Sequence, residues 1–197
     1  MINTADMLKI FQGYRGDAIV VPGHGGRHWI NISTKPNLDA IIGGGHPGMG
    51  GQASFALGLA LAQPNRKVVL FDSEGDLLMG FGVLATIADR APKNFYHFLL
   101  DNECYGLTGG QPVPNGKNMR YDIIARGAGY PDTYNFVDIE EFSGNIERIM
   151  AKPGPVFVAM KVIPEINNLP IEKRIPWQTR RPIEVLKDLR KELGLAR

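Results

Sequence analysis

The apolar and polar positions of this chain form two kinds of segment that alternate along its length. Short runs of apolar and β-branched residues, stopped by glycine, proline or an acidic residue, predict buried strands over 17–23, 67–72, 94–101, 133–138 and 154–163. Apolar residues at helical spacing predict helices over 48–65, 77–91, 119–130, 139–153 and 182–194. Strands that are apolar on both faces and alternate with helices indicate an α/β fold, in which helices cover both faces of a parallel sheet in three layers.

The length and charge of the chain limit its domain organisation and its partners. With 197 residues, we expect one domain with a core over about 17–163, followed by a C-terminal extension and helix over 164–197. A net charge of +2 gives no sign of a nucleic-acid surface. The positive charge is concentrated after residue 171, where it is typical of a solvated tail helix.

Cysteine content and hydropathy limit the class of protein further. Cys104 is the only cysteine, which excludes a disulfide framework and an iron–sulfur or structural zinc site built by this chain alone. No segment approaches the roughly 18 apolar residues of a membrane helix, and the N-terminal stretch lacks a signal-peptide core. We therefore expect a cytoplasmic protein with no membrane and no nucleic-acid partner.

Acidic and amide side chains gather where two predicted strands end. The turn after one strand carries Asp72, Glu74 and Asp76, and the next strand ends in Asp101 and Asn102. Ligands of parallel α/β sheets bind beyond the carboxyl ends of the strands. Mg²⁺ takes about six oxygen ligands from carboxylates, amides, phosphates and water, and the N-terminus of the following helix would direct free amides at a phosphate. This pattern predicts a site for a metal and a diphosphate.

Residues 70–111 resemble the cofactor-binding motif of thiamine-diphosphate enzymes, which runs Gly-Asp-Gly, then just under thirty residues, then Asn. The similarity is greatest to the sulfopyruvate and phosphonopyruvate decarboxylases. It lies in the segments LLMGFGVLATIA, PKNF and LLDNECYGLTGGQ. Three further segments are similar to the same family: AIVVPGHGGRHW, GMGGQASFALGLALA and GPVFVAMKV. The resemblance covers most of 17–163 and implies a diphosphate-binding (PP-type) domain that uses thiamine diphosphate and Mg²⁺.

The resemblance implies a role for individual residues. Asn102 would give its side-chain oxygen to the metal, and Cys104 would give its backbone carbonyl. Met49 matches the apolar residue that bends the cofactor, and Pro47 matches the residue whose backbone carbonyl receives the cofactor's amino group. The other residues implied to contact the cofactor are Gly23, Gly25, Gly26, Gly48, Gly75, Asp76, Leu77, Tyr105 and Gly106.

The match breaks at the metal carboxylate. Aligning LLMGFGVLATIA places Ser73, Glu74 and Gly75 where the family has Gly-Asp-Gly, which makes Glu74 the metal ligand. Alternatively, Gly75 and Asp76 form the Gly-Asp step, or the metal site is altered or lost. The longer run of matches favours Glu74. Asp76 then directly precedes the helix and is expected to cap it, while Asp72 only terminates its strand.

Basic side chains are predicted at the mouth of the site. His24 and His46 are candidate catalytic residues, because a histidine titrates near neutral pH and can move protons. Arg27 and His28 are candidate substrate-binding residues, since the guanidinium fork matches carboxylate, sulfonate and phosphonate groups. Where the family has Thr-Ser, positions 25–26 are glycines, which offer backbone N–H groups or leave room. His97 lies within an apolar strand and is predicted to be structural.

The resemblance accounts for only one of the two domains that form a thiamine-diphosphate site. Thiamine enzymes need a glutamate at the pyrimidine ring, and in this family it belongs to a separate pyrimidine-binding domain. The resemblance therefore implies a partner, an alpha-type subunit in an α2β2 or larger assembly, and a beta-type lyase subunit that decarboxylates a small 2-oxo acid. Two alternatives stay open: another thiamine reaction (carboligation, C–C lysis or oxidative acyl transfer), or a degenerate binding or regulatory subunit.

Overall fold

A five-stranded, fully parallel sheet forms the centre of the molecule in a computed structural model that describes residues 1–41, 48–173 and 178–195. The strand order is β1-β2-β3-β7-β6. The bounds are β1 (Ile19–Val21), β2 (Val68–Ser73), β3 (Phe95–Asp101), β6 (Asp132–Phe136) and β7 (Val156–Lys161). All seven residues of β3 are buried, as expected for a central strand that is covered on both faces.

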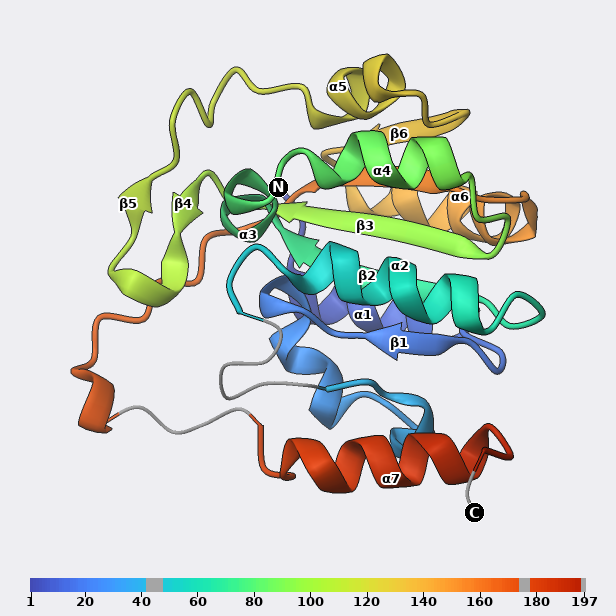
Figure 1. The fold of residues 1–197 in the computed structure, drawn as a ribbon. Helices are drawn as coiled ribbons and strands as arrows, with labels where there is room; N and C mark the ends of the chain where they lie inside the picture. Colours follow the sequence, from blue (N-terminus) through green and yellow to red (C-terminus); the bar gives the residue numbers. More distant parts are fainter. Residues whose placement is uncertain (42–47, 174–177, 196–197) are drawn as a thin grey trace.

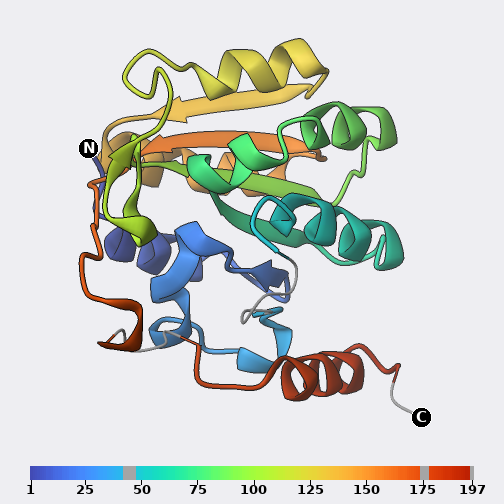
Figure 2. The ribbon, with the colours of Figure 1, turned by 60° about the vertical axis from the view of Figure 1, so that its left-hand side comes forward.

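Helices lie on both faces of this sheet (Figure 1). One core cluster joins the sheet to α2 (Gln52–Ala62), α4 (Val83–Arg90) and α5 (Tyr121–Ala128). A second core cluster joins the opposite face to α1 (Thr4–Gln12) and α6 (Ile139–Ala151). Figure 2 shows the sheet between these two helical layers. The predicted α/β fold with a three-layer parallel sheet is confirmed.

The predicted helix over 77–91 is two helices, α3 (Glu74–Met79) and α4. The break lies at Gly80, where a Cβ atom would come within 2.3 Å of the carbonyl oxygen of Gly50. This close backbone contact brings the turn before α2 against the end of α3. α3 begins at the residue after β2 ends, at the carboxyl end of the sheet.

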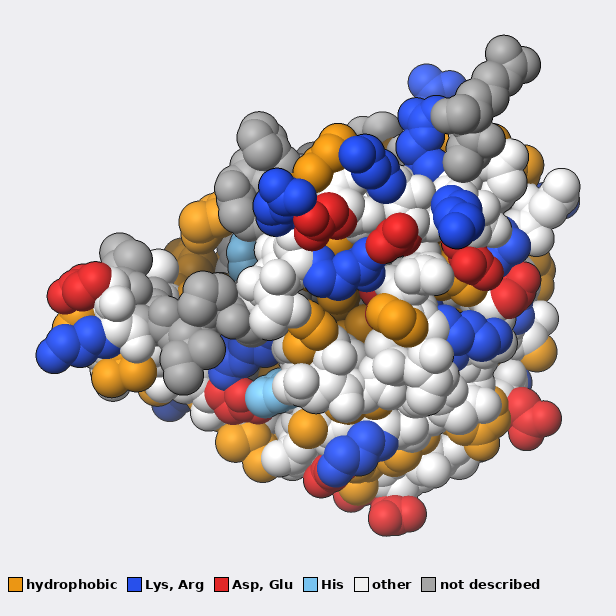
Figure 3. Space-filling model, turned by 90° about the horizontal axis from the view of Figure 1, so that it is seen from below, with side chains coloured by type: hydrophobic (Ala, Val, Ile, Leu, Met, Phe, Trp, Pro, Cys, Tyr) orange, Lys and Arg blue, Asp and Glu red, His pale blue; other side chains and the backbone are white. Residues whose placement is uncertain are grey.

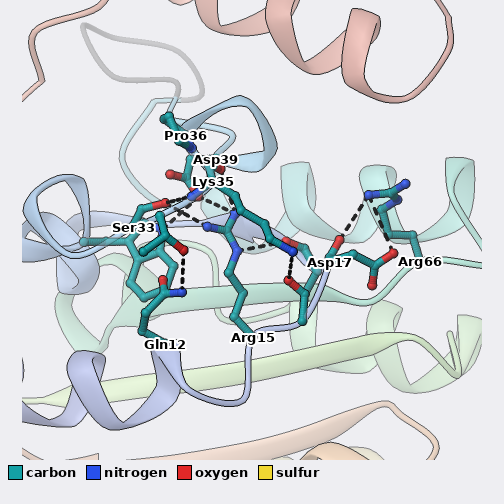
Figure 4. Close-up of polar contacts among 12 residues, drawn as sticks. Gln12, Arg15, Asp17, Ser33, Lys35, Pro36, Asp39 and Arg66 are labelled. Carbon is teal, nitrogen blue, oxygen red and sulfur yellow. Dashed lines mark hydrogen bonds and ion pairs between the residues drawn. The ribbon is translucent and has the colours of Figure 1, made fainter.

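A buried ion pair anchors the connection between β1 and α2 (Figure 4). Arg15 Nη2 donates to Asp39 Oδ1 at 2.7 Å, and both side chains are almost completely buried. Asp39 Oδ1 also accepts from Trp29 Nε1 at 2.9 Å. Trp29 lies in the 3-10 helix η1 (His24–Asn31), so this network holds the segment that carries the predicted basic residues of the site.

The C-terminal helix α7 (Pro182–Glu192) packs against the short 3-10 helix η2 (Pro36–Leu38). Val185 and Leu189 are its buried residues. Figure 3 shows basic and acidic side chains interspersed on the face of the molecule seen from below. In the part of the chain that the structure describes, no helix has the length and apolar character needed to cross a membrane.

Candidate active site

A pocket of about 220 Å³ lies at the carboxyl ends of β2 and β3. η1, α3, the short strand β4 (Cys104–Tyr105) and the segment that follows β7 surround it. The predicted site residues that line it are His24, Gly25, Arg27, His28, Met49, Gly75, Asp76, Asn102, Cys104, Tyr105 and Gly106. Lining residues that were not predicted include Ser73, Met79, Leu100, Leu107, Ile163 and Glu165.

Several predicted residues lie elsewhere. Leu77 is packed in the core at 2% exposure, so its side chain does not line the pocket. Gly23 is packed against the end of β2, and Gly48 is exposed on the turn before α2. His46 and Pro47 lie outside the described residues.

The two glycines at 25–26 make room for protein atoms. A Cβ on Gly25 would lie 2.3 Å from the carbonyl oxygen of Asp72 and 2.7 Å from Leu100 Cδ1. A Cβ on Gly26 would lie 2.8 Å from Phe71 Cβ. The missing side chains therefore let η1 pack against the end of β2, and Gly25 still borders the pocket.

Gly25→Ala is expected to lower the free energy of unfolding by about 1–3 kcal/mol, because the added methyl group meets backbone atoms that cannot move aside easily. Gly58→Ala is a matched control, since this exposed helical position in α2 has no atom within 4 Å of the added Cβ. The control should be neutral or stabilising by up to about 1 kcal/mol. Urea unfolding of both variants measures the difference. Equal stability of the two would contradict this account of η1 packing.

The prediction that Asp76 caps the helix is wrong. Ser73 is the N-cap of α3, and its Oγ accepts from the backbone N–H of Asp76 at 3.3 Å. Asp76 lies inside the first turn, where its Oδ1 accepts from the Gly50 N–H at 2.8 Å and lies 3.2 Å from His24 Nδ1. The hydrogen bond to Asp76 raises the pKa of His24, despite its partial burial. Asp76 thus joins the turn before α2 to η1.

Glu74 is fully buried and does not line the pocket, although its chain neighbours Ser73 and Gly75 do. Its Oε1 accepts from the Cys104 N–H at 3.0 Å, and Asn102 Oδ1 accepts from the same N–H at 2.9 Å. Its Oε2 has no hydrogen-bond partner among the described residues. Burial, followed by the charge of Asp101, raises the pKa of Glu74 to about 7.

Asp72 and Asp101 each contact a basic side chain. Asp72 Oδ2 lies 3.1 Å from His97 Nε2, and both side chains are buried in the core. His97 Nδ1 lies 3.3 Å from the Tyr130 hydroxyl, which is consistent with the structural role predicted for His97. Asp101 Oδ2 lies 2.7 Å from the Nζ of Lys161, at the end of β7. Asp72 therefore does more than end its strand, since it forms a buried pair.

Arg27 and His28 share one carboxylate. Arg27 Nη2 donates to Glu165 Oε2 at 2.6 Å, and His28 Nε2 lies 2.7 Å from the same oxygen. Sequence reasoning did not find Glu165, because 138 positions separate it from Arg27 and no local motif marks it. The chain after β7 passes the carboxyl end of the sheet (Figure 1), and this path brings Glu165 to Arg27 and His28.

Residues 24–160 match the protein family described as thiamine pyrophosphate enzyme, C-terminal TPP binding domain. The chain belongs to this family. Its sequence is 31% identical over 173 residues to the sulfopyruvate decarboxylase subunit beta of Methanothermobacter thermautotrophicus, covering 87% of this chain and 88% of that one. Membership of the family supports thiamine diphosphate as the cofactor of this chain.

Other relatives are matched over a smaller part of their length. The sulfopyruvate decarboxylase subunit beta of Methanocaldococcus jannaschii is 37% identical over 59% of this chain and 61% of that one. The phosphonopyruvate decarboxylase of Streptomyces viridochromogenes is 34% identical over 75% of this chain and 36% of that one. The fold also matches the crystal structure of benzoylformate decarboxylase from Polynucleobacter necessarius, with a TM-score of 0.68, 14% identity, and coverage of 84% of this chain and 34% of that one.

Two oxygen donors that meet at the Cys104 N–H are of the kind that a hard cation takes. Glu74 brings a carboxylate with an unpartnered oxygen, and such a buried group calls for a compensating partner. The amide oxygen of Asn102 accepts from the backbone N–H of Cys104, as Glu74 Oε1 does. The described residues contain no group of three or more His, Cys, Asp or Glu side chains that could hold a metal. A cation here would therefore need oxygens from amides, carbonyls, phosphates or water as well, which is the set that Mg²⁺ prefers.

Proposed function

We propose that the chain is the beta-type subunit of a thiamine-diphosphate- and Mg²⁺-dependent lyase that decarboxylates a 2-oxo acid. The observation that carries the proposal is the convergence of Glu74 and Asn102 on the N–H of Cys104, which together with Asn102 lines a pocket at the carboxyl end of the sheet. Three relatives named as decarboxylases support the reaction type. When bound, thiamine diphosphate supplies the carbon nucleophile and the electron sink that loss of CO2 requires.

Glu74 is the metal ligand that the contacts favour over Asp76. A metal needs at least one carboxylate oxygen that no other donor occupies. Asp76 Oδ1 already accepts from Gly50 and contacts His24, whereas Glu74 Oε2 has no partner among the described residues. Asn102 and the Cys104 backbone complete the protein's share of the metal ligands in this proposal, and α3 places Glu74 immediately after β2.

His24 is the proton-handling residue of this half of the site. Its ring lines the pocket and is oriented by Asp76, which also raises its pKa and so enlarges the protonated fraction near neutral pH. Met49 is 59% exposed beside the same pocket, where its thioether is placed to support the bent form of the cofactor. His46 remains a second candidate for proton transfer.

An apolar rim around the pocket mouth supports a partner subunit. Met49, Met79 and Ile163 line the pocket and are each at least 47% exposed. Ile166, which follows the lining residue Glu165 in the chain, is 49% exposed. Exposed apolar groups that gather beside a binding site are typical of a protein interface. The partner we propose is a pyrimidine-binding, alpha-type subunit that supplies the activating glutamate in an α2β2 or larger assembly.

The test is cofactor binding and CO2 release by the chain co-expressed with its alpha-type partner. Isothermal titration of thiamine diphosphate should show binding in the presence of Mg²⁺ and its loss in EDTA. The complex, but not the chain alone, should release CO2 from 2-oxo acids. Absence of binding at millimolar cofactor would rule out the proposed function and favour a degenerate subunit. Binding without CO2 release from any 2-oxo acid would point to a different thiamine reaction.

A further inference from the structure

We infer that the substrate is a 2-oxo acid whose side chain is apolar and carries no second acidic group. This inference rests on the proposed function and narrows its substrate class. It differs from what the names of the sulfopyruvate and phosphonopyruvate relatives suggest, since both of those acids carry a strongly acidic group in addition to the 2-oxo carboxylate. Two features of the pocket carry it: the pairing of its cations and the chemistry of its walls.

Glu165 occupies the anion-binding face of Arg27 and His28. One oxygen, Glu165 Oε2, accepts from Arg27 at 2.6 Å and lies 2.7 Å from His28 Nε2. Arg27 Nη2 also contacts the backbone carbonyl of Glu165 at 3.3 Å. Burial alone would raise the pKa of Glu165, but the hydrogen bonds from Arg27 and His28 lower it overall, so this carboxylate is charged. The guanidinium that would clamp a sulfonate is therefore already neutralised by the protein.

His24, the other basic side chain of the pocket, also contacts a carboxylate. His24 Nδ1 lies 3.2 Å from Asp76 Oδ1. Among the pocket-lining residues that the structure describes, His24, Arg27 and His28 are the only basic ones, and each contacts a carboxylate. A second anionic group on the substrate would meet Glu165 or Asp76 beside each cation, and like charges in a partly buried site repel strongly.

The backbone on both sides of Glu165 packs against the loop that follows β4. The N–H of Asn167 donates to the Gly106 carbonyl at 2.8 Å. A Cβ on Gly106 would lie 3.0 Å from the carbonyl oxygen of Glu165, and a Cβ on Gly110 would lie 2.7 Å from Ile166 Cδ1. The segment is thus packed tightly on the β4 loop, so an incoming sulfonate would have to break two charge-assisted hydrogen bonds to reach Arg27.

The rest of the lining suits an apolar side chain. Methionine, leucine, valine and isoleucine supply much of the wall, from the turn before α2, α3, the end of β3, the 3-10 helix η3 (Gly106–Thr108) and the segment after β7. These residues are Met49, Met79, Leu100, Leu107, Val162 and Ile163. A short aliphatic substituent gains from burial against such a wall, whereas a sulfonate or phosphonate loses hydration there without a free cation in return.

The experiment compares four substrates on the two-chain complex loaded with thiamine diphosphate and Mg²⁺. The kcat/KM for CO2 release is measured with 2-oxobutanoate, 2-oxoisovalerate, sulfopyruvate and phosphonopyruvate. We expect at least one of the two aliphatic acids to exceed both strongly acidic ones by about tenfold or more. A preference for sulfopyruvate or phosphonopyruvate would overturn the inference and leave the decarboxylase function standing. Failure to decarboxylate any of the four would count against the proposed function itself, and the inference would fall with it.

Two variants test the role of Glu165 separately from the substrate ranking. Glu165→Gln keeps the size of the side chain and releases the charge of Arg27, so the ratio of kcat/KM for sulfopyruvate to that for 2-oxobutanoate should rise about tenfold. Glu172→Gln, an exposed position further along the same segment, is the control and should leave the ratio unchanged. An unchanged ratio in Glu165→Gln would show that Glu165 does not set the specificity. The wild-type ranking tests the substrate class without any variant.

Discussion

Glu74→Ala is expected to weaken Mg²⁺-dependent binding of thiamine diphosphate by on the order of 100-fold or more, because it removes the proposed metal carboxylate outright. Isothermal titration with and without Mg²⁺ measures this on the co-expressed complex. The variant should also lose the difference between the two conditions, since the carboxylate proposed to bind the cation is gone. The folded state should tolerate the change, because a buried carboxylate with an unpartnered oxygen is costly to bury.

The pH dependence of cofactor binding is a second test of Glu74 as the metal ligand. The pKa of Glu74 is raised to about 7, so a proton competes with the cation below that pH. Because a metal ligand must be deprotonated, cofactor affinity in Mg²⁺ should rise with pH up to about 7 and then level off. Glu74→Ala should flatten this profile. A profile that falls as pH rises toward 7 would contradict the assignment.

Asp76→Ala is the matched comparison for the metal site. It removes the anchor of Gly50 and His24 and should weaken binding by about tenfold, with the Mg²⁺ dependence retained. If Asp76→Ala alone abolished the Mg²⁺ dependence, the metal carboxylate would be Asp76, and the alignment of this turn would be shifted by two residues.

Asp39→Ala is expected to lower the free energy of unfolding by about 3–5 kcal/mol. The substitution leaves the Arg15 guanidinium buried without its counter-charge and removes the acceptor of Trp29 Nε1. Such a loss is a large share of the roughly 5–15 kcal/mol that stabilises a typical domain. Equilibrium unfolding of the full chain in urea, followed by tryptophan fluorescence, measures it.

An exposed ion pair in the same region is the control for this prediction. Arg66 Nη1 lies 3.8 Å from Asp17 Oδ2, and the Asp17 side chain is 73% exposed (Figure 4). Asp17→Ala should therefore change the free energy of unfolding by less than about 1 kcal/mol. The double variant Arg15→Met with Asp39→Leu should recover much of the lost stability, because it removes both buried charges. A loss as small in Asp39→Ala as in Asp17→Ala would show that the buried pair does not anchor this connection.

The strands were predictable because their signal is local. β2 and β3 are runs of apolar residues that end in polar ones, and burial on both faces of a parallel sheet demands such runs. The start of α3 was predicted wrongly because two nearby residues can each cap a helix. Asp76 directly precedes the apolar residues of the helix and Ser73 stands three positions earlier, but both residue types can cap a helix, so the residue types alone did not decide between them.

By itself, the sequence determined the α/β class, the placement of acidic and amide groups at neighbouring strand ends, and the resemblance to thiamine-diphosphate enzymes. These depend on short-range patterns of residue type. Only the tertiary structure decided that Glu74 is buried without lining the pocket while Asp76 lines it, and that Glu165 neutralises Arg27. The environment of a side chain is set by whatever the fold packs around it, including residues more than a hundred positions away, and no local pattern records those neighbours.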